Sequence, residues 1–268
     1  MDDPSFRESV ESGVLYSTVL PGSGNIISGT AVLIRNFAKD IRDAFIQDSG
    51  IKVALGYNPR STMEWKGHRP STRMGAIAML RENFMKAKKM QRLIEAGKKS
   101  IDEVDPTTDV FMDILSNKHR LMVHLHKEDD AMVLIQLVQE FGLKAVSIPI
   151  IYGPMDALPY KVELKNESWR NVEKLLRSGA KFSMMSDHPV ILQRNMFYTL
   201  RHLLHFGLSK SNAISKITSE AAEIIGIKGI GQIRPGFKAS FVVWNGDPFS
   251  LTSYPILVVA EGKIVHKE

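Results

Sequence analysis

Two histidines separated by a single residue, His124 and His126, have the types and spacing that could do chemistry. They follow the apolar residues of RLMVHL, which predict a strand over Arg120–Leu125. Residues at positions i and i+2 of a strand share a face, so both imidazoles would point into the same space. Two such rings can bind one metal ion, or one can bind the metal while the other contacts substrate. The pair is equally compatible with two polar residues at a strand end.

A carboxylate occupies a comparable position further along the chain. Asp187 follows the apolar run over 182–185 and precedes His188 and Pro189. At the mouth of a buried strand, such a group can ligate a metal and accept a proton from metal-bound water. The alternative is an N-cap or Asx-turn aspartate ahead of the helix expected from Gln193. The position of Asp187 taken alone favours the cap. Its pairing with the HxH motif that precedes it in the chain favours a functional site.

Two loops that follow predicted strands add polar groups. The glycine-rich turn over Pro21–Asn25 could present backbone N–H groups to an anion or a carbonyl, or it could be a turn without a ligand. Asn58 lies in a similar loop, over Gly56–Arg60. Asn25 and Asn58 are therefore candidate substrate-binding residues.

The elements that must position these residues alternate along the chain. Apolar and β-branched runs predict strands over 13–20, 31–36, 51–55, 120–125, 144–147, 148–152 and 180–185. Helical periodicity, N-cap residues and closing glycines predict helices over 71–97, 129–141, 167–178, 193–205, 209–217 and 219–225. Strands separated by helices indicate parallel βαβ units. Eight such units form a barrel of about 250 residues whose active site lies at the carboxyl ends of the strands.

One junction breaks this alternation. The runs over 144–147 and 148–152 leave no room for the crossover of about a dozen residues that a parallel connection needs. Either they form one strand kinked at Pro149, or a segment is absent from the sequence. From Gly231 the chain changes to two or three short strands with Gly and Pro, which indicates a small β module that must extend a sheet formed elsewhere.

Composition bounds the classes of function. The chain has 268 residues, 44% hydrophobic and 24% charged, and no cysteine, which excludes a thiolate nucleophile and Cys-ligated zinc and fits a reducing cytoplasm. The net charge is +6, but the basic run over 86–99 has the spacing of a solvated helix face, so we expect no nucleic-acid partner. No apolar stretch approaches the ~20 residues of a membrane span, and the polar, acidic start is unlike a secretory signal.

Several motifs, in chain order, resemble those of the amidohydrolase superfamily. VHLHKEDD resembles its strand-five histidine motif and MMSDHPV its strand-eight aspartate motif. ITSEAAEIIGI and the run from GQIRPGFKAS resemble its closing helix and closing strands. GVLYSTVLPGSGNIISG and GIKVALGYNPR resemble loops of the branch near imidazolonepropionase and the dipeptidase-like enzymes.

The resemblance implies a (β/α)8 TIM barrel over 1–230, incomplete in this sequence, and part of a small β-sandwich over 231–268. It implies one or two divalent metal ions, usually zinc, and hydrolysis of a C–N bond of a small-molecule amide or cyclic amide. By this resemblance Asp187 is a metal ligand and the proton-shuttling catalytic residue, and His124 and His126 are metal ligands. His188 would line the substrate pocket. By analogy we expect a homo-oligomer.

Three departures from the family pattern support an alternative. No HxH precedes Gly13, no histidine follows the run over 143–147, and Tyr57 stands where related sequences commonly carry glutamate. The alternative function is a non-catalytic barrel that acts as a scaffold or binds a small molecule. Metal content discriminates between the two, because a catalytic member should purify with about one or two equivalents of transition metal.

Overall fold

The structure is a computed structural model that describes residues 3–61, 70–143 and 148–268. Its strands form a four-stranded sheet in the order β1-β2-β3-β4, a pair β5-β6 and a three-stranded sheet β7-β8-β9. The strands are β1 (Tyr16–Val19), β2 (Ile27–Arg35), β3 (Phe45–Ala54), β4 (Leu121–His124), β5 (Ile150–Tyr152), β6 (Phe182–Met184), β7 (Phe241–Trp244), β8 (Pro255–Ala260) and β9 (Lys263–Lys267).

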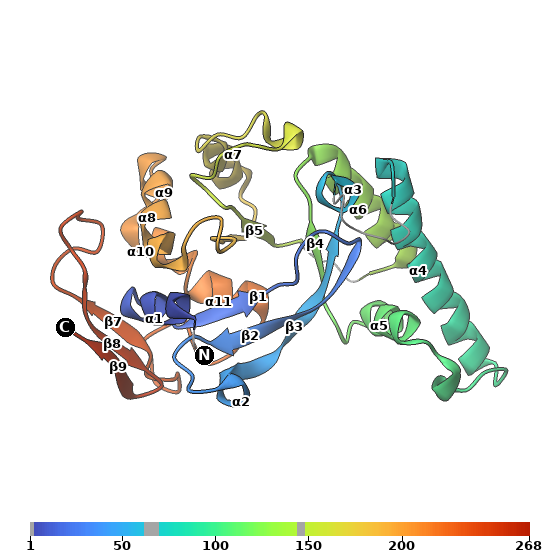
Figure 1. The fold of residues 1–268 in the computed structure, drawn as a ribbon, viewed down its shortest axis with the longest axis horizontal. Coiled ribbons are helices and arrows are strands. Elements are labelled where there is room, and N and C mark those ends of the chain that lie inside the picture. The colour runs from blue at the N-terminus through green and yellow to red at the C-terminus, as the bar shows by residue number, and fades with distance from the viewer. Residues whose placement is uncertain (1–2, 62–69, 144–147) are drawn as a thin grey trace.

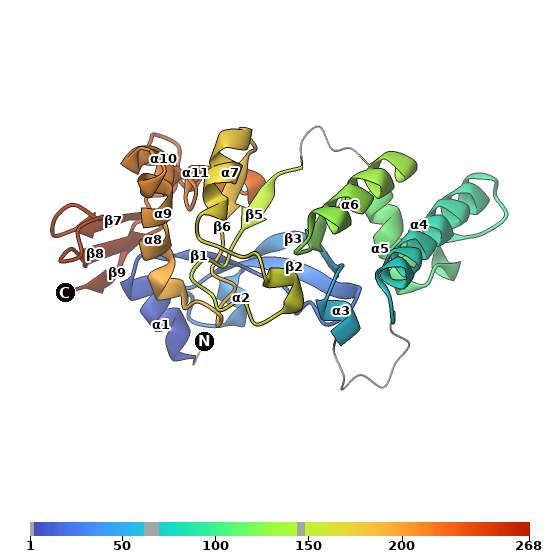
Figure 2. The same cartoon turned by 90° about the horizontal axis from the view of Figure 1, so that it is seen from above.

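Helices surround these sheets, and those between β3 and β6 gather above and beside them (Figures 1 and 2). The α-helices are α1 (Pro4–Glu11), α2 (Ile41–Ala44), α3 (Asn58–Ser61), α4 (Arg73–Glu95), α5 (Pro106–Leu115), α6 (Glu128–Phe141), α7 (Asn171–Ser178), α8 (Met196–Thr199), α9 (Arg201–His205), α10 (Lys210–Ser215) and α11 (Ser219–Ile225). Short 3-10 helices are η1 (Ile101–Glu103), η2 (Val162–Leu164) and η3 (Gln193–Asn195). No helix in the described part of the chain is both long and apolar enough to cross a membrane.

The four-stranded sheet mixes strand directions. β1 pairs with β2, and β2 with β3, in antiparallel ladders, whereas β3 and β4 are parallel. The loops over 20–26 and 36–44 are too short for a parallel crossover, so the first three strands must reverse direction. Register shifts interrupt the β2–β3 ladder, and such irregularities bend a sheet.

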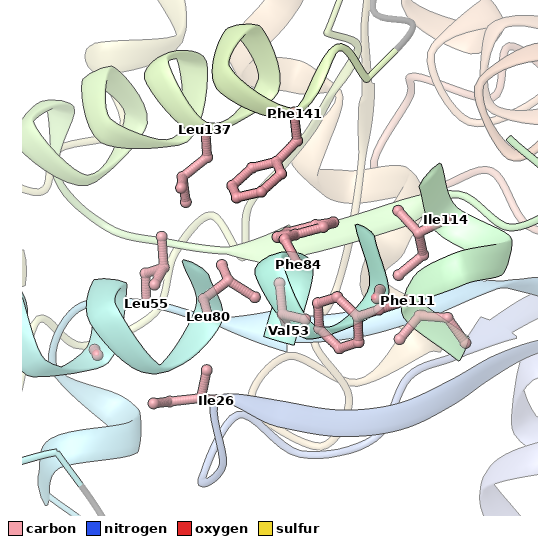
Figure 3. Close-up of a cluster of buried hydrophobic side chains, with 12 residues drawn as sticks. Ile26, Val53, Leu55, Leu80, Phe84, Phe111, Ile114, Leu137 and Phe141 are labelled. Atoms are coloured by element: carbon pink, nitrogen blue, oxygen red, sulfur yellow. The ribbon is translucent and has the colours of Figure 1, made fainter. Parts of the chain in front are cut away.

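Helices α4, α5 and α6 cover one face of this sheet and form the largest apolar core. Thr72 caps the first turn of α4 by accepting a hydrogen bond from the N–H of Gly75. Phe84, on the buried stripe of α4, packs against Phe111 and Phe141 from the other two helices, with ring centroids 4.8 and 4.9 Å apart (Figure 3). Alternate residues of β3 complete the cluster, so packing against the helices fixes which face of β3 is buried in this core.

The parallel pair β5–β6 has its own apolar core, to which helices α7 to α10 contribute. Val172, Phe182, Leu200 and Leu203 are buried in this second cluster. The α7 helix ends at Gly179 in the left-handed conformation, as the closing glycine in the sequence predicts.

The C-terminal sheet β7-β8-β9 lies at the opposite end of the molecule from α4 (Figure 1). Polar contacts join it to the first sheet. The Tyr16 hydroxyl lies 3.0 Å from the Ser240 Oγ, and Arg35 forms a 3.0 Å ion pair with Glu261. Val10 and Val258 form a small apolar cluster beneath these contacts.

Most predicted elements are confirmed, although β2 and β3 begin earlier than the strands predicted over 31–36 and 51–55, and other predictions differ more. The predicted helix over 193–205 is instead η3, α8 and α9 in succession, because Asn195 and Leu200 interrupt its regular hydrogen bonding. The predicted helix from Glu167 begins at Asn171. A closed barrel of parallel strands is not confirmed, since the described parallel ladders are β3–β4 and β5–β6. The predicted strand over 144–147 falls outside the described residues.

Candidate functional site

Strands β3 and β4 divide their side chains between two faces. Ile51 and Val53 of β3 point into the core beneath α4. Successive residues of a strand alternate, so Lys52 points to the opposite face. In the parallel register Ala54 pairs with His124, and paired residues share a face. The strand pattern therefore places Lys52 and His124 on the sheet face opposite the one that α4, α5 and α6 cover.

His124 and His126 meet at the carboxyl end of β4, as the HxH spacing predicts. Their ring centroids are 4.5 Å apart and the rings are nearly perpendicular, at 85°. Asn58 follows the end of the neighbouring strand, and its Nδ2 lies 3.1 Å from the Nε2 of His124. Because an amide NH2 group only donates, the Nε2 of His124 must be the acceptor and its Nδ1 carries the proton. The structure thus brings three predicted site residues together.

The surroundings of both imidazoles disfavour their charged form. Burial, followed by the charges of His126 and Lys52, lowers the pKa of His124 to about 3. Burial and then the charge of Lys161 lower the pKa of His126, against the opposing effect of Glu163. Neutral imidazoles are hydrogen-bond acceptors and metal ligands, whereas protonated ones are neither.

A buried ionic cluster adjoins His126. Glu163, just within η2, has a side chain that is 5% exposed and accepts a 2.9 Å hydrogen bond from the N–H of Tyr57. It also pairs with Arg60 at 2.9 Å and with Arg73. Burial alone would raise the pKa of Glu163, but the Tyr57 N–H and the two guanidinium groups lower it overall.

The same cluster contains a second carboxylate. Asp130, in the first turn of α6, has a side chain that is 3% exposed and lies 3.0 Å from Arg73. Burial raises the pKa of Asp130, and the Arg73 charge only partly opposes this. Arg73 therefore bridges two carboxylates from elements far apart in the sequence.

Gly56 makes this close approach possible. Its φ of +79° is in the region that favours glycine, and a Cβ there would lie 2.8 Å from the Glu163 Oε2 and 2.9 Å from the Asp130 Oδ2. Both contacts are shorter than side-chain atoms tolerate, so a glycine is required at the end of β3.

Asp187 and His188 follow β6 and are both exposed. Asp187 has a φ of +52°, and its charge raises the pKa of both Lys52 and His126, although burial dominates and lowers each pKa overall. Asp187 does not cap the next helix, because the N-cap of η3 is Leu192 and no side chain caps it. The N-cap half of that alternative is therefore wrong, and Asp187 instead begins a turn in which its carbonyl oxygen accepts a 2.8 Å hydrogen bond from the N–H of Val190.

The glycine-rich loop presents oxygen atoms to a cation. The Lys52 ammonium lies 3.3 Å from the Pro21 carbonyl oxygen and 3.4 Å from the Ser23 Oγ. Asn25 contributes its carbonyl oxygen to the Ser28 hydroxyl within the loop, at 3.1 Å. These contacts differ from the anion-binding arrangement that the glycine content suggests, because carbonyl and hydroxyl oxygens here face a positive charge.

Three charged groups around the histidines are not singled out by the sequence: Lys52, Lys161 and Glu163. Lys52 interrupts an apolar strand, which is a signal that could have identified it, since lysine is seldom fully buried. Glu163 belongs to the irregular stretch between β5 and α7, where no periodicity predicts direction.

The donor set fits a divalent metal only in part. Neutral His124 and His126 have the chemistry of zinc ligands, and His126 Nδ1 is a buried polar atom with no hydrogen-bond partner in the part of the chain that the structure describes. Within residues 3–61, 70–143 and 148–268, however, no three His, Cys, Asp or Glu side chains are grouped so as to hold a metal ion. The described residues therefore do not complete a metal centre.

Comparisons with known proteins agree with one another. The model of the Amidohydrolase family matches residues 82–265. The chain is similar to Amidohydrolase tasK of Hapsidospora irregularis, with 26% identity over 306 residues that cover 97% of this chain and 31% of that protein. The chain thus spans under a third of the length of this curated relative.

A solved structure extends the likeness to the fold. An amidohydrolase from Thermotoga maritima MSB8 superposes with a TM-score of 0.92 at 28% identity, over 99% of this chain and 75% of that one. The family match covers more than half of the chain and includes the HxH pair, the two carboxylates of the ionic cluster and the loop that carries Asp187, whereas Arg60 and Arg73 precede it. The chain belongs to the amidohydrolase family.

Proposed function

We propose that this chain carries a hydrolase site that cleaves a C–N bond, in an amide or cyclic amide, of a small molecule. The observation that carries the proposal is the HxH pair at the carboxyl end of β4, beside Asn58 at the end of β3. Carboxyl ends of parallel strands are where barrel enzymes bind and transform their substrates. Membership of the amidohydrolase family supports the reaction class.

A divalent metal ion, zinc by preference, is the proposed cofactor, and His124, His126 and Asp187 are the ligands that this chain would contribute once the Asn58 amide leaves the Nε2 of His124. Such an ion polarises a carbonyl and lowers the pKa of bound water. The imidazoles suit this role because burial keeps them neutral. A pKa of about 3 also makes His124 a poor general base at neutral pH, so accepting and ligating are its proposed roles.

Asp187 is the proposed proton carrier. It is exposed at the end of β6 and within electrostatic reach of Lys52 and His126. A carboxylate there can accept a proton from the attacking water and return it to the leaving nitrogen. Asn58 and His188 are proposed to contact substrate, and Lys52 adds a positive charge that favours a polarised or anionic substrate group.

The test is turnover of N-acyl amino acids, dipeptides and cyclic amides by the purified chain supplied with zinc. Asp187→Asn keeps the size of the side chain but removes the proton acceptor, so we expect about a 10²–10⁴-fold loss of kcat. Asp48→Asn is the matched control, since Asp48 is an exposed carboxylate on β3. Equal activity of wild type and Asp187→Asn would remove Asp187 from the mechanism.

A second candidate function is small-molecule binding without turnover. The observation that favours it is the Asn58 amide, which already occupies the Nε2 of His124. A binding protein would retain substrate-class ligands in equilibrium dialysis, with zinc and without it, and would release no cleaved product.

A further inference from the structure

Glu163 is the best-anchored side chain beside the two histidines. One carboxylate receives the Tyr57 backbone N–H at 2.9 Å, the Arg60 guanidinium at 2.9 Å and the Arg73 guanidinium. Charge-assisted hydrogen bonds of this kind fix a carboxylate in orientation as well as charge. Glu163 therefore has little freedom to rotate, although it lies in an irregular segment far along the chain from β4.

This carboxylate approaches the Nδ1 of His126. The His126 Nδ1 lies 3.5 Å from the Glu163 Oε2, and the His126 side chain is 11% exposed. Nδ1 itself is buried and has no hydrogen-bond partner among the described residues. A separation of 3.5 Å is longer than a formed N–H···O bond, but catalytic hydrogen bonds are often long in unliganded proteins and shorten on binding.

The two tautomers of His126 differ sharply in this environment. With the proton on Nδ1, the N–H points toward a fixed carboxylate. With the proton on Nε2, the buried lone pair of Nδ1 faces the Glu163 Oε2, so two acceptors oppose each other without a proton between them. Burial makes an unpaired polar atom costly, so the first tautomer is favoured.

We propose that Glu163 is a positioning residue that holds His126 with its proton on Nδ1, so that Nε2 keeps its lone pair for a ligand or substrate. The effect of Glu163 on turnover rests on the function proposed above, but its effect on the tautomer of His126 does not. A side chain that orients an imidazole through its other nitrogen fixes the direction from which the ring can bind a metal or a substrate.

The pair is then asymmetric. His124 is held by Asn58 on its Nε2, whereas His126 is held by Glu163 on its Nδ1. The Nε2 of His126 is then the nitrogen that binds a ligand or substrate. Glu163 makes it available by holding the opposite nitrogen, without contacting the ligand itself.

The test is the tautomer of His126 in the full chain, read from two-bond ¹⁵N–¹H correlations of histidine-labelled protein. His126→Gln assigns the signals by their loss. In the wild type we expect the Nδ1–H form in at least about tenfold excess, as for a hydrogen bond to a charged acceptor. A wild-type ring protonated on Nε2 would overturn the proposal without any variant.

Glu163→Gln removes the charge and can turn its NH2 group toward Nδ1, so we expect the excess to fall by about tenfold or to invert. Asp130→Asn is the matched control, because Asp130 is equally buried and shares Arg73, but within the described residues no hydrogen bond or ion pair joins it to His126. Glu163→Asp should restore part of the excess. Equal spectra for Glu163→Gln and wild type would contradict the proposal, as would equal shifts in Asp130→Asn.

Turnover separates this proposal from the proposed function. If the chain hydrolyses its substrate, Glu163→Gln should lower activity by about 10–100-fold, as loss of an orienting partner does. Asp130→Asn should lower it less. If the chain hydrolyses nothing but His126 carries its proton on Nδ1 in a Glu163-dependent way, the positioning role stands and the hydrolase function fails.

Discussion

At the scale of single residues, the two neighbouring histidines of the HxH pair have different partners. His124 and His126 come from one strand end, yet Asn58 contacts the first and Glu163 approaches the second. Both rings are kept neutral mainly by burial, and the nearby Lys161 charge adds to this. Reactivity at this site thus depends on the partners of each nitrogen more than on the HxH spacing.

Gly56 offers a test of the ionic cluster. In Gly56→Ala, the new Cβ would displace the Glu163 and Asp130 carboxylates, and disturbing such buried pairs costs about 3–5 kcal/mol. Gly97→Ala is the matched control, because Gly97 has a φ of +66° but no neighbour within 4 Å of its Cβ position. It should cost only the left-handed strain of about 1–2 kcal/mol. Urea unfolding of both variants measures the difference, and equal losses would mean that the cluster tolerates the methyl group.

The sequence predicts part of this site and not the rest. His124, His126 and Asn58 lie at strand ends, where alternation and chain order indicate direction, and the structure brings them together. Glu163 reaches the site from an irregular segment, and its partners are set by tertiary contacts that no local pattern encodes. The part played by Asp187 stays a prediction.

At the scale of elements, caps and periodicity predict the helices well. The 23-residue α4 begins after Thr72, as its capping residue predicts. Helices α1 and α5 are not among the elements predicted from the sequence. Both helices nevertheless share one start signal, an aspartate N-cap followed by proline at the first helical position. The prediction of one continuous helix over 193–205 is wrong. The apolar periodicity of this segment indicates a helix, but the chain breaks into shorter helices at Asn195 and Leu200.

Phe84 tests whether α4 is held mainly by its buried face. Its side chain is fully buried against Phe111 and Phe141, so Phe84→Ala should lower the free energy of unfolding by about 3–5 kcal/mol. Met85→Ala is a control on the same helix, since Met85 is 59% exposed and should change stability by about 0.5 kcal/mol or less. Chemical denaturation compares them, and a small loss for Phe84→Ala would mean that the core can repack.

At the scale of the whole molecule, the C-terminal sheet lies at one end of the long axis and α4 at the other, and the four-stranded sheet and the β5–β6 pair lie between them (Figures 1 and 2). Contacts between Tyr16, Arg35 and Glu261 join the last sheet to the first. The superposition on the Thermotoga amidohydrolase covers 99% of this chain and 75% of that one. The antiparallel start of the sheet differs from the parallel units that the sequence favours, and the short connections over 20–26 and 36–44 are the signal that could have indicated it.

Equilibrium zinc binding to the chelator-treated full chain tests the central claim, that the paired imidazoles at the end of β4 are the functional centre. We predict about one equivalent bound by the wild type and by His119→Asn, which alters a histidine on the other side of β4 in the sequence. The double variant His124→Asn with His126→Asn should lose that binding. Wild-type protein that binds no zinc, or a double variant that binds it as tightly as wild type, would contradict the account.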